Sequence, residues 1–151
     1  MPEKTTLKRA AEDKREGKAP STQAGEFVRE EMDHIRQGKH GARNTKQAIA
    51  IGLSKARRAG VNLKPPKKGT VSAKTRKSAE SAYRKGRSSA KTSSPRSRAV
   101  EGALKREGRS AASRRNLSRQ VKSAARKRSA ASRSQAARKA ARTRQHERKA
   151  A

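Results

Sequence analysis

The basic residues of this 151-residue chain are concentrated in its C-terminal part. Residues 64–151 contain 29 Lys or Arg side chains and 4 acidic ones, whereas residues 1–63 contain 14 basic and 8 acidic side chains. Large apolar residues are scarce, with one Phe, one Tyr, two Met and no Trp. Low hydrophobicity with high net charge favours disorder, because too little apolar surface is available to offset the loss of chain entropy. The composition therefore predicts a small folded unit followed by a long solvated tail.

Residues 20–63 have the periodicity of packed helices. A first helix is expected from about residue 23 to residue 37, since apolar side chains recur there at intervals of three or four positions. These side chains belong to Ala24, Val28, Met32 and Ile35. The acidic side chains of the same helix are expected on its solvated face, and they belong to Glu26, Glu30, Glu31 and Asp33.

A second helix is expected from about residue 45 to residue 59. Asn44 and Gln47 resemble a capping box at its beginning, and Gly60 suits the position after its end. Gly52 shares a face with the apolar residues of this helix, where the missing side chain would let the first helix approach closely. We therefore expect the two helices to form a hairpin.

The sequence divides into four regions. They are a charged N-terminal arm with a short helix (1–19), the helical hairpin (20–63), a proline-containing linker (64–69) and a low-complexity basic tail (70–151). The predicted fold is mostly α, with a short helix–loop–helix hairpin and a long, basic, largely disordered or conditionally helical C-terminal tail. Residues 111–149 contain no Pro or Gly, so charge repulsion is the main barrier to helix there, and phosphate binding would remove it.

The sequence offers little to catalysis. It has no cysteine, and its three histidines, His34, His40 and His146, are expected to be solvated and too few for a metal site. No Ser/His/Asp set and no phosphate-binding glycine loop is recognisable. We therefore expect no enzyme activity, no cofactor and no metal. No apolar stretch approaches the ~20 residues of a membrane helix, and no signal peptide is visible, so a cytoplasmic, nucleoid-associated location is expected.

Nucleic acid is the partner that this charge distribution favours, because duplex DNA carries one negative charge per ~1.7 Å of its axis. Aromatic stacking platforms are missing, so contacts to the backbone are expected rather than contacts to bases. In the loop before the second helix, the candidate contacts are Lys39, Arg43 and Lys46. In the tail, the candidate contacts are Arg87, Arg109, Arg114, Arg115, Arg126, Lys127, Arg128, Arg138, Lys139, Arg142 and Arg144.

Residues 21–69 resemble a family of small bacterial proteins labelled plasmid stabilization proteins, with most of the likeness in the run KQAIAIGLSKARRAG (46–60). The tail sequence SAARKRSAASRSQAARKAARTR (123–144) is similar to that family as well. The resemblance implies a bacterial basic protein associated with a chromosome or plasmid, and it supplies no catalytic residues. The tail also resembles linker histones in composition.

The first hypothesis is a non-catalytic, largely sequence-independent protein that binds and condenses duplex DNA, in plasmid or nucleoid maintenance. A second is an RNA- or ribosome-associated protein. A third is an adaptor whose hairpin binds a protein partner, or a second copy of the chain, while the tail holds nucleic acid. The sequence leaves DNA or RNA preference, sequence specificity and oligomeric state open.

Overall fold

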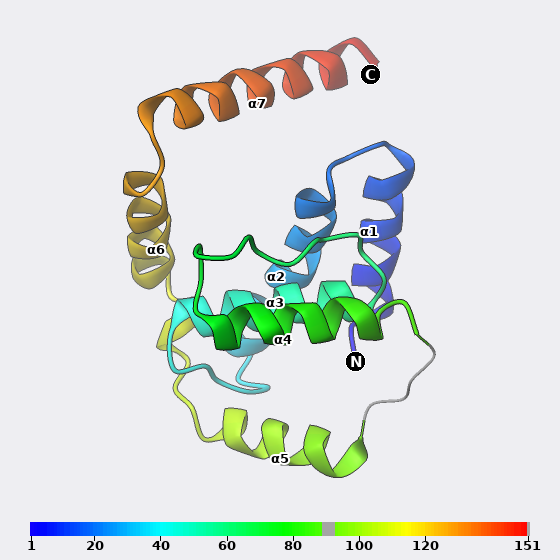
Figure 1. The fold of residues 1–151 in the computed structure, drawn as a ribbon, viewed down its shortest axis with the longest axis vertical. Coiled ribbons are helices and arrows are strands. Elements are labelled where there is room, and N and C mark those ends of the chain that lie inside the picture. The colour runs from blue at the N-terminus through cyan, green and yellow to red at the C-terminus, as the bar shows by residue number, and fades with distance from the viewer. Residues whose placement is uncertain (89–92, 151) are drawn as a thin grey trace. The chain divides into compact units, whose positions relative to one another are not determined.

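The computed structural model describes residues 1–88 and 93–150, and all regular secondary structure in them is helical (Figure 1). The chain forms two compact units, Met1–Ser113 and Arg114–Ala151. The helices of the first unit are α1 (Lys4–Arg15), α2 (Pro20–Arg36), α3 (Thr45–Arg58), α4 (Ala73–Lys85), α5 (Ser94–Lys105) and the 3-10 helix η1 (Ser110–Ala112). Those of the second unit are α6 (Arg114–Arg126) and α7 (Ala130–Ala150). The prediction of a mostly α fold is confirmed.

Helices α2 and α3 form a closely packed hairpin in the first unit. The side chains of Phe27 and Ile35 on α2 are fully buried. Gly52 on α3 lies against the backbone of α2, where an added methyl group would come within 2.7 Å of Val28 Cα. The close approach predicted at Gly52 is therefore confirmed.

The beginning of α3 is capped much as the sequence predicts. The Asn44 side chain accepts a hydrogen bond from the Gln47 N–H at 2.9 Å. The Gln47 side chain in turn accepts one from the Arg43 N–H, also at 2.9 Å, which is one residue earlier than in a standard capping box. One amide that the start of α3 would otherwise leave unpaired, that of Gln47, is thereby satisfied, together with the Arg43 amide just before the helix.

Helices α1 and α4 each pack against one helix of the hairpin. α1 packs against α2, and α4 packs against α3. Ala10 of α1 joins a buried cluster with Ala24, Phe27 and Ala56. On α4, Ala79 and Ala82 are the buried residues. Small side chains therefore supply much of the packing, which allows a chain with few large apolar residues to form a core.

The end of α5 and the segment after it pair with the loop between α2 and α3. The Gly41 N–H donates to the Leu104 carbonyl at 2.9 Å, and the Ala42 N–H donates to the Gly108 carbonyl at 3.0 Å. A side chain at Gly41 would collide with the Glu107 carbonyl, so glycine is required at this approach. The loop is therefore joined to residues more than 60 positions away in the sequence.

The 3-10 helix η1 completes this contact. Ala111 and Ala112 are each only 1% exposed. Thr45 Oγ1 donates to the Ala111 carbonyl at 2.7 Å, and Arg36 Nε donates to the Ala112 carbonyl at 3.2 Å. The end of α2 and the beginning of α3 thus bind the same short segment.

The prediction of a long, largely disordered tail is wrong. Residues 73–85, 94–105, 114–126 and 130–150 are α-helical, and residues up to 113 belong to the same compact unit as the hairpin. The prediction counted only large apolar residues and gave charge repulsion too much weight. Alanine and arginine favour helix, and alanine methyl groups can be buried against other helices without a large apolar side chain.

Candidate functional site

Helix α6 carries a continuous basic stripe. Its four side chains are spaced by four, three and four residues, so they lie on one face of a helix with 3.6 residues per turn. They belong to Arg115, Arg119, Lys122 and Arg126, and all four are exposed. No residue of α6 is acidic. On the opposite face lie Leu117 and Val121, and Val121 is 67% exposed.

The basic side chains of α7 are distributed more evenly around the helix. One group shares a face, with separations of 4 and 7 residues, and consists of Arg138, Arg142 and Lys149. A second face carries Arg133, Arg144 and Arg148, and Lys139 lies beside the first group. Arg144 Nε donates to the Ala140 carbonyl of its own helix at 3.3 Å. α7 therefore presents positive charge in several directions, whereas four of the five basic residues of α6 share one face.

Two of the predicted contact residues in the second unit lie between these helices. Lys127 is exposed, and Arg128 donates to the Ser132 carbonyl at 3.1 Å. Arg114 begins α6, away from the stripe. Arg119 and Lys122 are not among the contacts predicted from the sequence. The sequence pattern that could have identified them is a basic residue at every third or fourth position from Arg115 to Arg126. The same periodicity identifies the apolar face of a helix.

The predicted contacts in the first unit are more varied. Lys39 Nζ donates to Glu3 Oε1 at 3.0 Å, and Arg87 stacks on the Tyr83 ring at 4.0 Å while donating to Asn62 Oδ1. Both side chains therefore have partners within the chain.

The other three predicted residues of this unit are exposed. Arg43 and Lys46 lie beside the beginning of α3. Arg109 also reaches this region, since its guanidinium would lie 3.2 Å from a side-chain carbon added at Gly38. The fold thus brings Arg109 to the same loop as Lys39 and Arg43.

A second feature of the first unit is a buried group of charged side chains. The side chains of Glu30 and Glu31 on α2 are only 2% and 1% exposed. Lys55 Nζ, from α3, lies 2.7 Å from Glu31 Oε2 and 3.6 Å from Glu30 Oε1. The prediction that these two acids lie on a solvated face is wrong. Glu31 is four residues from both Phe27 and Ile35, so its place on the buried face could have been read from the spacing.

Two histidines adjoin these carboxylates. His40 Nε2 lies 2.8 Å from Glu31 Oε1, and His34 Nε2 lies 2.8 Å from Glu3 Oε1. The His34 and His40 rings are nearly perpendicular, with centroids 6.0 Å apart. Their side chains are 13% and 12% exposed, so the prediction of solvated histidines is wrong for this pair. Hydrogen bonds from His34 and from Lys39 lower the pKa of Glu3 to about 2.

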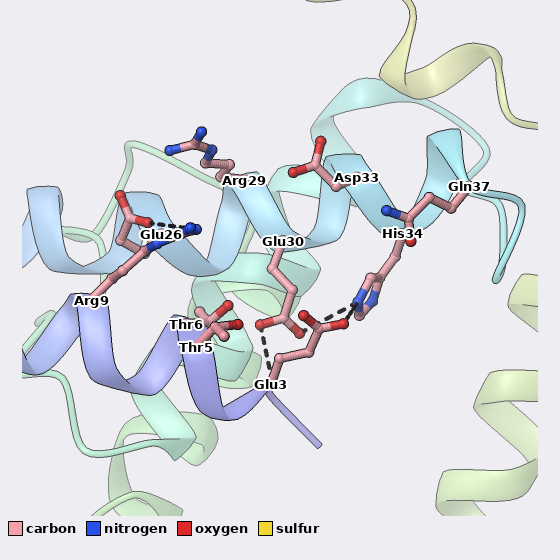
Figure 2. A pocket seen from close by; sticks show the side chains of 10 residues that line it. All are labelled: Glu3, Thr5, Thr6, Arg9, Glu26, Arg29, Glu30, Asp33, His34 and Gln37. Carbon is pink, nitrogen blue, oxygen red and sulfur yellow. Dashed lines mark hydrogen bonds and ion pairs between the residues drawn. The ribbon is translucent and has the colours of Figure 1, made fainter.

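A small cavity lies between α1 and α2 beside this group (Figure 2). Glu3, Glu30 and His34 point toward one another at one side of it, and Arg9 and Glu26 line the other side. Its volume of about 100 Å³ is well below the ~300–1,000 Å³ of typical small-molecule sites. The cavity therefore suits an ion or a few waters better than an organic substrate.

Comparison with known families finds one match, in residues 14–68, to a family described as of unknown function (DUF6496). That region spans the end of α1, the α2–α3 hairpin and the linker, and it excludes α6 and α7. Neither the curated proteins nor the solved structures contain a match to the chain. The resemblance to plasmid stabilization proteins is therefore wrong as an identification, since the family found over the same residues has no assigned function. Among the described residues, no helix is long and apolar enough to cross a membrane.

Proposed function

We propose that this protein binds nucleic acid, with duplex DNA as the primary target, through phosphate contacts made by basic helices. The binding would be non-catalytic and largely independent of base sequence. The observation that carries the proposal is the stripe on α6, which gathers four exposed cations on one helix face with no acidic residue on that helix. Such binding would place the protein with the cell's DNA, as a nucleoid-associated protein.

The dimensions of the stripe support a phosphate contact. From Arg115 to Arg126 the helix rises about 16 Å at 1.5 Å per residue. A strand of duplex DNA presents one phosphate per ~3.4 Å of axis, so this length faces four or five phosphates. Four basic side chains over the same length are a suitable match. The basic side chains of α7, which point in several directions, could contact the other strand or a second duplex and so favour condensation.

The shortage of aromatic residues supports backbone contacts over base contacts. The chain has one Phe and one Tyr. Phe27 is fully buried, and the Tyr83 ring is covered on one side by Arg87. Stacking on aromatic side chains is the usual means of binding single strands and unpaired bases. A single half-buried ring that already stacks with Arg87 offers little for such stacking, and this favours a duplex target.

The test is a comparison of two variants with equal net charge. The stripe variant replaces Arg115, Arg119, Lys122 and Arg126 with Gln. The control variant replaces four exposed cations of the first unit with Gln, and these are Lys4, Lys8, Lys14 and Arg58. Binding to a linear duplex is measured by fluorescence anisotropy across a salt series. If about 10 phosphates are contacted, the slope of log affinity against log salt for the unsubstituted protein is near −9.

We expect the stripe variant to lose about 3 to 4 units of this slope, since each lost contact removes about 0.9. The control variant should keep the slope to within about 1 unit. Equal losses in the two variants would mean that net charge alone determines binding, and the proposal for α6 would be wrong. A duplex RNA of equal length is measured in parallel, and tighter binding to RNA at matched salt would assign the protein to RNA instead.

A further inference from the structure

A carboxylate and two imidazoles converge where α2 ends and the following loop folds back. Glu31, His34 and His40 each offer one ligand atom, and these atoms all lie within 4.8 Å of one another. We propose that these three residues form a binding site for a divalent transition-metal ion, with Zn²⁺ as the best match. This inference goes beyond nucleic-acid binding and is tested separately from it.

The local fold explains why these three residues meet. Glu31 and His34 are three residues apart on α2, so their side chains project from the same face. Helix bundles use the same Glu-x-x-His spacing to hold metal ions. The chain then turns through Gly38, whose φ of 76° favours glycine, and this turn brings His40 back to the end of α2. The backbone pairing of Gly41 with Leu104 holds the loop in that position.

The contacts of His40 and Glu31 are those of metal ligands with supporting partners. His40 Nδ1 lies 3.1 Å from the Gly41 carbonyl, so an Nδ1–H would leave the Nε2 lone pair directed at Glu31. A ligating histidine usually donates its other N–H to a carbonyl in this way. Lys55 lies against Glu31 Oε2, which leaves Oε1 facing His40. Although His40 Nε2 and Glu31 Oε1 are 2.8 Å apart, neither oxygen of the Glu31 carboxylate makes a hydrogen bond of acceptable geometry.

The charge of the surrounding group also favours a cation. Three carboxylates, those of Glu3, Glu30 and Glu31, face two ammonium groups, those of Lys39 and Lys55. With neutral histidines this leaves one negative charge, and the Glu30 and Glu31 side chains are almost fully buried. A buried charge without compensation is costly. Either a bound cation or a proton on one histidine would compensate it. A proton on His40 Nε2 would join only that atom to Glu31 Oε1, whereas a bound cation would use the ligand atoms of all three residues.

The ligand types identify the ion. Imidazole nitrogen and carboxylate oxygen both bind Zn²⁺, at about 2.0–2.2 Å, and two histidines with one glutamate is a known set of three protein ligands. Mg²⁺ and Ca²⁺ prefer oxygen ligands throughout and keep more of them. Three protein ligands leave a fourth position for water.

The experiment is a titration of the full-length protein, freed of metal with a chelator, with Zn²⁺ alone in competition with a chromophoric chelator. We expect one equivalent of Zn²⁺ to bind. His40→Ala and His34→Ala should each weaken this binding by about 100-fold or more, since loss of even a supporting residue costs 10–100-fold. The matched control is His146→Ala on α7, which should leave Zn²⁺ binding unchanged. Far-UV circular dichroism confirms that each variant keeps its helices.

A second measurement uses the unsubstituted protein and needs no variant. Addition of Zn²⁺ should shift the NMR resonances of the His34 and His40 rings and leave those of His146 in place. Binding should also raise the melting temperature, because the ion binds the folded state. Absence of a saturable one-to-one complex, or equal weakening by His146→Ala, would overturn the proposal. In that case the group is an ion-pair network in which a histidine proton balances the charge.

Discussion

Residues 1–63 and residues 114–151 each contain 14 basic side chains, yet the two regions handle this charge in opposite ways. The first region also contains 8 acidic residues, and several of its cations lie against them, as Lys18 does with Asp13 and Lys55 with Glu31. The second region contains a single acidic residue, Glu147. The number of basic residues alone is therefore a poor guide to the net positive charge available to a binding partner. That net charge depends on how many acidic residues lie in the same region.

The two regions also differ in how many side chains are buried. α2 has seven buried residues, among them Phe27 and Ile35, whereas no residue of α6 is buried. Substitutions in the first region should therefore change stability with little effect on binding. Substitutions on α6 should change binding with little effect on stability.

The largest expected effect is on stability, from Phe27→Ala. The Phe27 side chain is fully buried among its neighbours. Removing its ring should therefore lower the free energy of unfolding by about 3–5 kcal/mol. The matched substitution in the second region is Val121→Ala, at a 67% exposed position, and it should change stability by less than about 0.5 kcal/mol. Urea denaturation followed by circular dichroism measures both.

The binding of the same two variants sharpens the comparison. Under conditions where Phe27→Ala remains folded, its affinity for duplex DNA should stay within about twofold of that of the unsubstituted protein, because the proposed contacts lie on other helices. A tenfold loss of affinity at matched salt would show that the first unit takes part in binding, and the division between the two regions would then be wrong.

A smaller effect is expected from adding one methyl group at Gly52. The new carbon would lie 2.7 Å from Val28 Cα, and a backbone atom cannot move aside as a flexible side chain can. Gly52→Ala should therefore cost about 1–3 kcal/mol of stability. The control is Gly102→Ala in α5, where no atom lies within 4 Å of the new carbon apart from the adjacent residues and the nearby backbone of the same helix. There the substitution should stabilise the protein by about 0.4–1 kcal/mol, because alanine favours helix and restricts the unfolded chain. Thermal denaturation that ranked the two variants in the opposite order would contradict the predicted contact.

The sequence predicts the α2–α3 hairpin well and the contacts around it poorly. The expected helices at about 23–37 and 45–59 correspond to Pro20–Arg36 and Thr45–Arg58, and the cap at Asn44 and the close approach at Gly52 are both present. These features depend on neighbouring residues and on apolar spacing. The docking of residues 104–112 depends on backbone amides, carbonyls and alanine methyl groups, and such groups leave no distinctive pattern in a sequence rich in Ala.

The candidate sites show the same limit. The basic tail could be identified from charge counts, but the stripe on α6 requires knowing that residues 114–126 form a helix. The Glu31, His34 and His40 group escaped prediction because acidic residues were assigned to the surface by their chemistry. Their position relative to Phe27 and Ile35 argued for burial, and that geometric signal was the better guide.

The smallest expected effect concerns pH and an exposed ion pair on α5. Lys105 Nζ lies 2.9 Å from Glu101 Oε1, and its hydrogen bond lowers the pKa of Glu101 below the ordinary value of 4.5. Because the pKa is lower in the folded state, the pair stabilises α5 above pH 4.5, and this contribution disappears as the pH falls through the lowered pKa. An NMR titration of residues 94–105 should therefore give a Glu101 pKa below 4.5, together with a slight loss of helix at the acidic end.

The pair is 59% exposed on both sides, so added salt should bring the Glu101 pKa closer to 4.5. The variant Lys105→Gln should bring it there without salt. If the pKa of Glu101 is 4.5 in the unsubstituted protein, the pair contributes nothing to α5. Ion pairs would then contribute to stability only where burial accompanies them, as it does for Glu30 and Glu31 beside Lys55.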